Sequence, residues 1–331
     1  MKRPIMANPY SWSTLARVGF LALALAVPAT TLAHGLVGKR FFPATIATDD
    51  PFVSDELSLP TVSSVRTNGS QDEPSSRETS VSGEFSKRIT PDFGFSVGVE
   101  HQRLSPSGQS SVNGFGNVGL GLKYQFYKDE AREALLSAGL GWQVGGTGSK
   151  AVGADGFSTF TPTLFFGKGF GDLPGSALYL KPLAVTGTFG VAMPRHASTT
   201  TTSVDPDTGS TVVSSEQHPN VLQLGLAIEY SAPYLQSFVK DVGLSAPFNR
   251  MIPLVEISLH KPLDRVSDRR MTGTVNPGVV WVGSLMQLGV EAVIPVNGRS
   301  GHGVGILAQL HFFLDDMFPH GIGRPLMGAR Q

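Results

Sequence analysis

Residues 221–230 read Val-Leu-Gln-Leu-Gly-Leu-Ala-Ile-Glu-Tyr, and residues 303–314 read Gly-Val-Gly-Ile-Leu-Ala-Gln-Leu-His-Phe-Phe-Leu. In both stretches, every second residue is apolar and mostly large. This alternation predicts a β-strand with two different faces. The residues on the other face are mostly Gly, Ala and Gln, with few charges. Such a face suits the crowded interior of a barrel better than open solvent, so the apolar face is expected to meet lipid.

The same alternation recurs along the chain and predicts an all-β fold, a transmembrane antiparallel β-barrel of about 12 strands (10–14). The strands are expected near residues 56–66, 78–89, 93–104, 115–127, 134–146, 158–169, 178–192, 220–231, 251–262, 272–282, 286–296 and 303–314. Several of them exceed the roughly 9–11 residues that a tilted strand needs to cross a bilayer. The first strand is the least regular, because Pro60 interrupts it.

The connections alternate between long polar loops and tighter turns. The long ones are residues 67–77, 105–114, 147–157, 193–219, 263–271 and 297–302. This alternation is typical of outer-membrane barrels, which have long extracellular loops and short periplasmic turns. Residues 232–250 are an exception, since they are long but fall on the periplasmic side, where a short helix over 234–242 is expected. An even number of strands places both termini in the periplasm.

Four segments are predicted along the chain. Residues 1–33 are expected to be a secretory signal peptide, because basic residues precede the uncharged apolar run 18–27 and small residues occupy the cleavage site. Residues 34–55 either trail in the periplasm or fold back as a plug. Residues 56–314 form the barrel, and residues 315–331 form a periplasmic tail. The protein is therefore expected in the outer membrane of a Gram-negative cell.

Composition excludes several classes of function. The 26 Lys+Arg residues balance 26 Asp+Glu residues, which rules out a polycation that grips nucleic acid. Without cysteine there is no disulfide scaffold and no thiol nucleophile. Gly114-x-Gly116-x-x-Gly119 matches a dinucleotide fingerprint, but a strand rather than a helix follows it. The eight histidines show no metal-ligand spacing, so neither a metal nor a cofactor is expected.

The stretch from Gly114 to Tyr124 (Gly-Phe-Gly-Asn-Val-Gly-Leu-Gly-Leu-Lys-Tyr) resembles a strand found in a family of bacterial outer-membrane barrels. These are the transporters named after the meta-cleavage pathway of phenol degradation. Residues 136–141 and 161–169 are similar to that family too, and the resemblance covers about residues 78–314. It implies a barrel that passes small, often aromatic or hydrophobic, molecules, and it supplies no catalytic residues.

Strand parity places a set of ionisable side chains inside the barrel. The candidates for a constriction are Glu229, Glu256, Lys123, His311, Glu291, Glu100 and Arg88. Glu229 and Glu256 are expected on neighbouring strands near the periplasmic end, with Lys123 or His311 at a similar depth to balance their charge. About eight strands leave a filled interior and about sixteen an open channel, so a salt-bridged filled barrel and a narrow route both remain possible.

The sequence therefore predicts an outer-membrane channel or transporter of small solutes and not an enzyme. One alternative is a structural or adhesive barrel whose long loops bind a partner. The enzymatic alternative, a barrel lipid hydrolase, needs a serine beside an outward His101, whereas Ser80 and Ser82 point inward. Outer-membrane lipid, the barrel-assembly machinery and an unidentified small solute are the expected partners, and nucleic acid is not.

Overall fold

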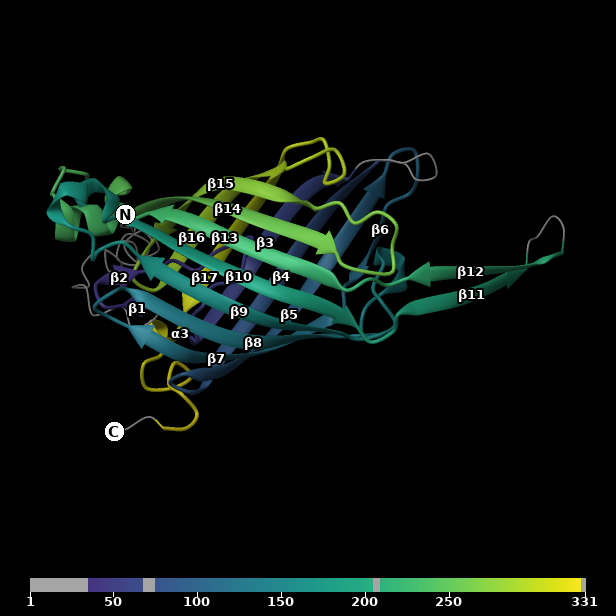
Figure 1. The fold of residues 1–331 in the computed structure, drawn as a ribbon, viewed down its shortest axis with the longest axis horizontal. Helices are drawn as coiled ribbons and strands as arrows, with labels where there is room; N and C mark the ends of the chain where they lie inside the picture. Colours follow the sequence, from purple (N-terminus) through teal and green to yellow (C-terminus); the bar gives the residue numbers. More distant parts are fainter. Residues whose placement is uncertain (1–34, 68–74, 205–208, 329–331) are drawn as a thin grey trace, which may run out of the picture. The chain divides into compact units, whose positions relative to one another are not determined.

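The computed structural model describes residues 35–67, 75–204 and 209–328, and twelve antiparallel strands in these ranges close into a barrel (Figure 1). The strands are β3 (Glu56–Thr67), β4 (Ser76–Thr90), β5 (Phe93–Pro106), β7 (Val118–Asp129), β8 (Ala134–Val144), β9 (Thr159–Gly169), β10 (Leu183–Pro194), β13 (Val221–Tyr230), β14 (Met251–Pro262), β15 (Thr272–Val282), β16 (Met286–Pro295) and β17 (Gly305–Phe313). β17 pairs with β3 and closes the ring. The predicted barrel is confirmed, while the predicted signal peptide lies outside the described residues.

Two strand predictions are wrong in detail. The strand expected over 178–192 is β10, which begins at Leu183, because residues Gly175–Leu180 form a 3-10 helix (η2) before it. The strand expected over 115–127 is divided into β6 (Val112–Phe115) and β7. Gly116 and Asn117 separate the two pieces, and both pieces pair with β5.

Pro60 does not end the first strand. β3 continues through it, and its register against β4 shifts between Ser58 and Thr61. The register against β17 also shifts at this level, between Gln309 and His311. A bulge is one of the few places where a residue without an N–H fits into a sheet, which explains how the proline is accommodated.

The two faces of the wall differ as the alternation predicts. Leu164, Phe189 and Ile306 point away from the lumen and are 56%, 53% and 52% exposed. Glu256 and Glu291 are 0% and 1% exposed, inside the barrel. None of the helices in the described ranges is both long and apolar enough to span a membrane.

The barrel has two different ends. At the long-loop end, Asn117 Oδ1 accepts a hydrogen bond from the Gly148 amide (2.9 Å) and so holds residues 145–158 against the wall. At the same end β11 (Ser198–Val204) and β12 (Thr211–Gln217) form a separate two-stranded ribbon that projects from the barrel (Figure 1). At the short-turn end, residues 231–250 begin with α2 (Ala232–Tyr234) and a π-helical turn, η3 (Leu235–Val239).

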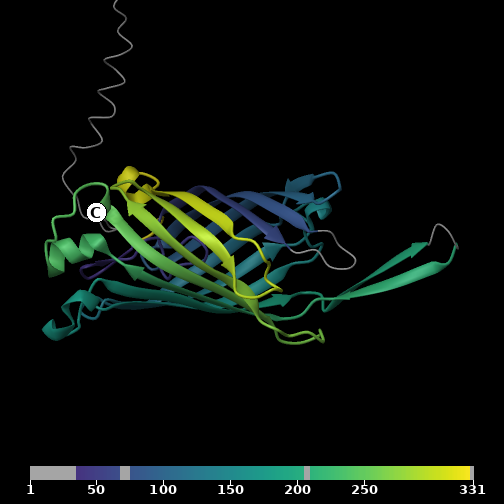
Figure 2. The same cartoon turned by 90° about the horizontal axis from the view of Figure 1, so that it is seen from above.

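Residues 35–55, called the inner segment below, lie inside the barrel at the short-turn end (Figure 2). They begin with a small hairpin, β1 (Leu36–Val37) and β2 (Arg40–Phe41). Two apolar clusters pack the inner segment against opposite parts of the wall, and these clusters are the core of the protein. One contains Val37, Phe42, Phe52, Leu135 and Ala184. In the other, Phe41 and Ile46 pack against Ile252, Leu254, Val280, Val282 and Phe313.

The chain after β17 stays at the short-turn end. It forms the short helix α3 (Leu314–Met317) and then runs beside the end of β4, where the amide of Leu326 donates to Arg88 O (3.1 Å). Lys87 Nζ donates to the carbonyl of Arg324 (2.5 Å). Both ends of the described chain therefore contribute to the same end of the barrel.

Candidate functional site

Glu256 is the centre of the lower lumen. Its Oε1 accepts the amide of Ile46 (2.7 Å), and its Oε2 accepts the amides of Ala47 (3.0 Å) and Thr48 (2.7 Å). The Thr48 hydroxyl donates to the same Oε2 (2.8 Å). Successive backbone N–H groups form an anion-binding concavity. Here the anion belongs to the wall and the concavity to the inner segment, so the contact fixes the segment's position.

Two other predicted lumen carboxylates, Glu229 and Glu291, lie near Glu256 and interact with it electrostatically. Both are almost fully buried, at 2% and 1% exposure. Glu291 Oε2 accepts a hydrogen bond from Asn276 Nδ2 (3.2 Å). The structure therefore brings three predicted glutamates together at the short-turn end. Within the described ranges, no group of three or more acidic or histidine side chains could hold a metal ion.

The counter-charges predicted for Glu229 and Glu256 are bound elsewhere. Lys123 Nζ donates to Asp49 Oδ1 (2.9 Å) and to Asp50 O (2.7 Å), and it lies 4.6 Å from the centre of the Phe165 ring. His311 Nδ1 lies 2.9 Å from Ser58 Oγ. The prediction that either residue balances the charge of the glutamates is wrong. Alternation along a strand predicts which face a side chain occupies, but not which groups of other strands or of the inner segment it contacts across the lumen. The cation that interacts with Glu229 is Arg40.

Arg88 and Glu100 occupy different levels of the lumen. Arg88 Nε donates to Asp55 Oδ2 (2.9 Å), and Lys87 Nζ donates to Asp55 Oδ1 (2.8 Å). Asp55 is fully buried, so this pair of cations anchors the end of the inner segment where β3 begins. Glu100 accepts a hydrogen bond from Gln102 Nε2 (2.8 Å) and belongs to the upper lumen.

The start of the inner segment is anchored by Arg40, a residue that the sequence did not single out. Its guanidinium donates to Glu133 Oε2 (3.1 Å) and to the carbonyl of Pro182 (2.8 Å), and it lies 3.7 Å above the Tyr234 ring. The Tyr234 hydroxyl donates to Glu133 Oε1 (2.9 Å). Burial, and then the neighbouring Glu133, raise the pKa of Tyr234 to about 12, so the hydroxyl remains a donor. Phe41 and Phe42 beside Arg40 are the sequence feature that could have indicated a packed segment here, because large apolar side chains are unfavourable in a tail exposed to solvent.

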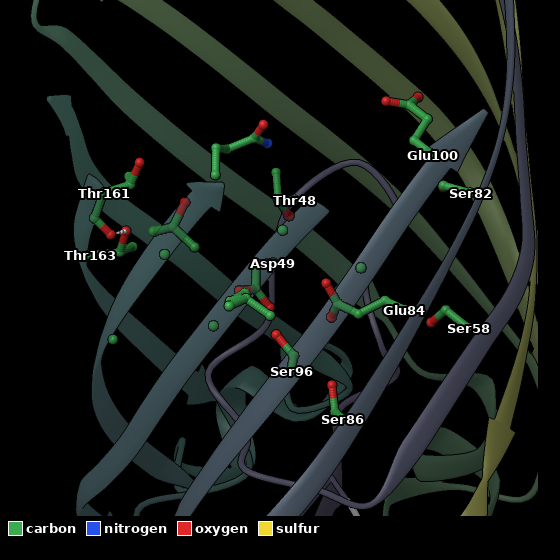
Figure 3. Close-up of a pocket in the computed structure, with 18 of the residues that line it drawn as sticks. Thr48, Asp49, Ser58, Ser82, Glu84, Ser86, Ser96, Glu100, Thr161 and Thr163 are labelled. Atoms are coloured by element: carbon green, nitrogen blue, oxygen red, sulfur yellow. Dashed lines mark hydrogen bonds between the residues drawn. The ribbon is translucent and has the colours of Figure 1, made fainter. Parts of the chain in front are cut away.

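Above the inner segment the lumen is open. A cavity of about 980 Å³ extends from residues 44–54 towards the long-loop end, where residues 152–155 contribute to its lining. Its wall carries mainly hydroxyl, amide and carboxylate groups (Figure 3). Those labelled in Figure 3 are Thr48, Asp49, Ser58, Ser82, Glu84, Ser86, Ser96, Glu100, Thr161 and Thr163. The barrel is thus filled in its lower part and hollow in its upper part.

Comparison with known proteins gives structural neighbours but no sequence relatives. No family model matches the chain, and no curated protein matches it. An outer-membrane channel from Pseudomonas putida F1 superimposes with a TM-score of 0.53 and 12% identity, over 82% of this chain and 99% of that chain. The fold is that of an outer-membrane β-barrel. The β-domain of the Bordetella autotransporter BrkA (0.48, 12% identity, 78% and 99% coverage) and the NanC porin (0.43, 11%, 77% and 98%) superimpose less well.

One group of side chains has the order of a hydrolase triad. Ser58 contacts His311, whose Nε2 lies 3.6 Å from Glu56 Oε2. The last distance is longer than a hydrogen bond, and here the serine faces Nδ1, the nitrogen that faces the carboxylate in a serine-protease triad. The outward His101 that the sequence considered packs against the ring of Phe115. These contacts favour a structural role for both histidines.

Proposed function

We propose that this protein is an outer-membrane channel for small polar solutes, with its long loops outside the cell and the inner segment acting as a plug on the periplasmic side. The observation that carries the proposal is the division of the lumen. The upper part is a polar cavity of about 980 Å³, and the inner segment forms its floor. A barrel with a purely structural role needs no cavity of this size, which falls at the upper end of the roughly 300–1,000 Å³ of solute sites.

The contacts of the inner segment support a closed state that can open. Arg40 and Asp55 hold its two ends with buried ion pairs, whereas Glu256 and Lys123 hold its middle with hydrogen bonds to the segment. Opening requires the middle to leave Glu256 and Lys123 while the ends stay bound. It also breaks the two hydrogen bonds between Ala44 and Gln287 and the one from Ser137 to the carbonyl of Pro51. A route past the plug then needs no unfolding of the barrel.

The resemblance to the phenol-pathway transporters implies an aromatic or hydrophobic solute. The cavity lining favours a polar one, since serine and threonine hydroxyls, side-chain amides and carboxylates together outnumber the apolar side chains that line it. We therefore keep the channel part of that prediction and propose a hydrophilic solute.

Planar-bilayer conductance in potassium chloride tests the proposal. The full-length protein should give small or infrequent current steps, and the double variant Arg40→Ala/Glu256→Gln should give larger and more frequent ones. It loses an end anchor, and it replaces one of the two Glu256 oxygens that accept from the inner segment with an NH2 group. Arg132→Ala, which breaks an exposed ion pair with Asp129, is the control and should behave as the wild type. Absence of current from all three proteins would contradict the channel.

A partner-binding barrel is the second candidate, and one observation favours it. The β11–β12 ribbon pairs with no other described strand, and Val204 and Val213 on it are 65% and 64% exposed. Unpaired strand edges are templates for another chain. Replacing residues 198–217 with a short turn should abolish adhesion if this candidate is correct, and should leave the conductance unchanged if the ribbon is only an external loop.

A further inference from the structure

The cavity above the inner segment has a large excess of negative charge. Its lining contains the carboxylates Asp49, Asp50, Glu56, Glu84, Glu100 and Asp155. Among the described lining residues, Lys123 is the sole lysine or arginine, and it is already bonded to Asp49. Charged groups in a confined lumen are costly unless opposite charge is near. The wall therefore has more carboxylates than its own cations can balance.

The carboxylates are distributed over one side of the wall and the floor. Glu84 on β4 lies opposite Ser58 in the register, and Glu100 on β5 lies opposite Ser82. Figure 3 shows Glu84 and Glu100 directed into the same space as Asp49 of the inner segment. Glu84 interacts electrostatically with Asp49 and Glu56, two groups of its own sign, and with a single cation, Lys123, which Asp49 also binds. A ligand with positive charge would relieve this repulsion at several points at once.

A second, independent feature points to a ligand that donates hydrogen bonds. Gln309 lines the cavity and is more than nine-tenths buried, with 8% exposure. Its Nε2 donates to Thr61 Oγ1 (3.1 Å), which leaves the amide oxygen directed away from that bond and without a partner. A buried acceptor without a donor costs free energy. The missing donor is what an ammonium or guanidinium group would supply.

The arrangement fits an extended organic cation better than a metal ion. No three acidic or histidine side chains in the described ranges converge as metal ligands, because the carboxylates belong to different strands and to the inner segment. Carboxylates that lie apart on the cavity wall match a ligand whose positively charged groups are separated along its length. We propose that the cavity is a binding site for a small organic polycation, with one cationic group between Glu84 and Asp49, a second against Glu100 and a third against Gln309. The register places Gln309 at the level of Glu100 but three strands away, through Thr61 and Ser82. The inference rests on the proposed function, because it names the solute class of that channel.

Isothermal titration of the full-length protein in detergent, at low salt and with spermidine as the probe, tests the inference. Spermidine should bind the wild type, and Glu84→Gln should weaken binding by about tenfold or more, the expected loss for a hydrogen bond to a charged group. Glu216→Gln is the matched control, since it removes one negative charge from the exposed ribbon. Sucrose, a neutral probe with many hydroxyl groups, should show no measurable binding to the wild type or to either variant.

Two outcomes would overturn the inference. One is no binding of spermidine to the wild type when heat-modifiable gel migration shows that the barrel is folded. The other is equal weakening by Glu84→Gln and Glu216→Gln, which would mean attraction to the whole protein rather than to the cavity. The potassium chloride conductance is a separate measurement. Conductance without spermidine binding would support the proposed channel and contradict the polycation site. Spermidine binding without conductance would support the polycation site and contradict the channel.

Discussion

The lumen is filled at the short-turn end and hollow towards the long-loop end, although the same strands form its wall at both levels. Gly289 faces the inner segment, and a Cβ added there would lie 2.2 Å from Ile46 Cδ1. Gly141 faces the cavity, and a Cβ added there would meet nothing closer than Thr161 Cβ at 3.6 Å. Both are strand glycines on the inner face. A glycine on the inner face of a strand therefore leaves space in the lumen. Whether that space is occupied depends on whether the inner segment reaches that level.

The largest expected effect comes from removing an anchor of the filled half. Arg40→Ala leaves Glu133 without its buried cation, and breaking such a pair costs about 3–5 kcal/mol. The loss should appear in the free energy of local opening of residues 35–55, measured by amide hydrogen exchange, with little change in the barrel strands. Exchange that speeds up equally in all strands would mean that the inner segment and barrel unfold as one unit.

The next effect contrasts the cavity with the lipid face. Leu164→Arg puts a charge on the outside of β9 near its centre and should cost about 2–4 kcal/mol of stability in the membrane. Thr163→Arg, one residue away, points into the acidic cavity and should cost much less. Urea unfolding in lipid vesicles measures both. Similar losses for the two variants would mean that the upper lumen has no room for a large side chain.

The glycine pair tests the comparison directly. Gly289→Ala should destabilise by about 1–3 kcal/mol, because the added methyl group collides with Ile46 in a packed region. Gly141→Ala should be neutral or stabilise by about 0.4–1 kcal/mol, because the methyl group enters open space and the unfolded chain loses freedom. The midpoint of thermal unfolding in detergent ranks the two. If the order is reversed, the lower lumen is less tightly packed than the contacts indicate.

The smallest effect is expected at the boundary between the halves. Asp49→Asn removes the carboxylate that Lys123 bonds, but the Asp49 side chain is 59% exposed to the solvent of the cavity. Solvent screens such a pair, so stability should change by less than about 1 kcal/mol. Thermal unfolding checks this. A loss as large as that of Arg40→Ala would place Asp49 among the anchors of the inner segment.

The sequence predicted the wall well and its contents poorly. β14 (Met251–Pro262) and β15 (Thr272–Val282) have the predicted bounds, because alternation with period two is written locally in the chain. Glu229, Glu256 and Glu291 were placed on the inner face by the same parity, and all three are buried there. The proposed pairing of Glu256 with Lys123 or His311 failed, since it required knowledge of groups across the lumen.

Local patterning in the sequence determined that this chain forms a twelve-stranded barrel with an apolar exterior, since each strand needs only its own alternation and its neighbours. The sequence could not determine whether residues 34–55 trail outside the barrel or enter it. Only the tertiary structure shows the inner segment meeting Glu256, Lys123 and Asp55's partners Lys87 and Arg88, which lie far along the chain. The physical reason is that a hydrogen bond across a lumen depends on the diameter, tilt and register of the whole ring, and no short stretch of residues encodes these.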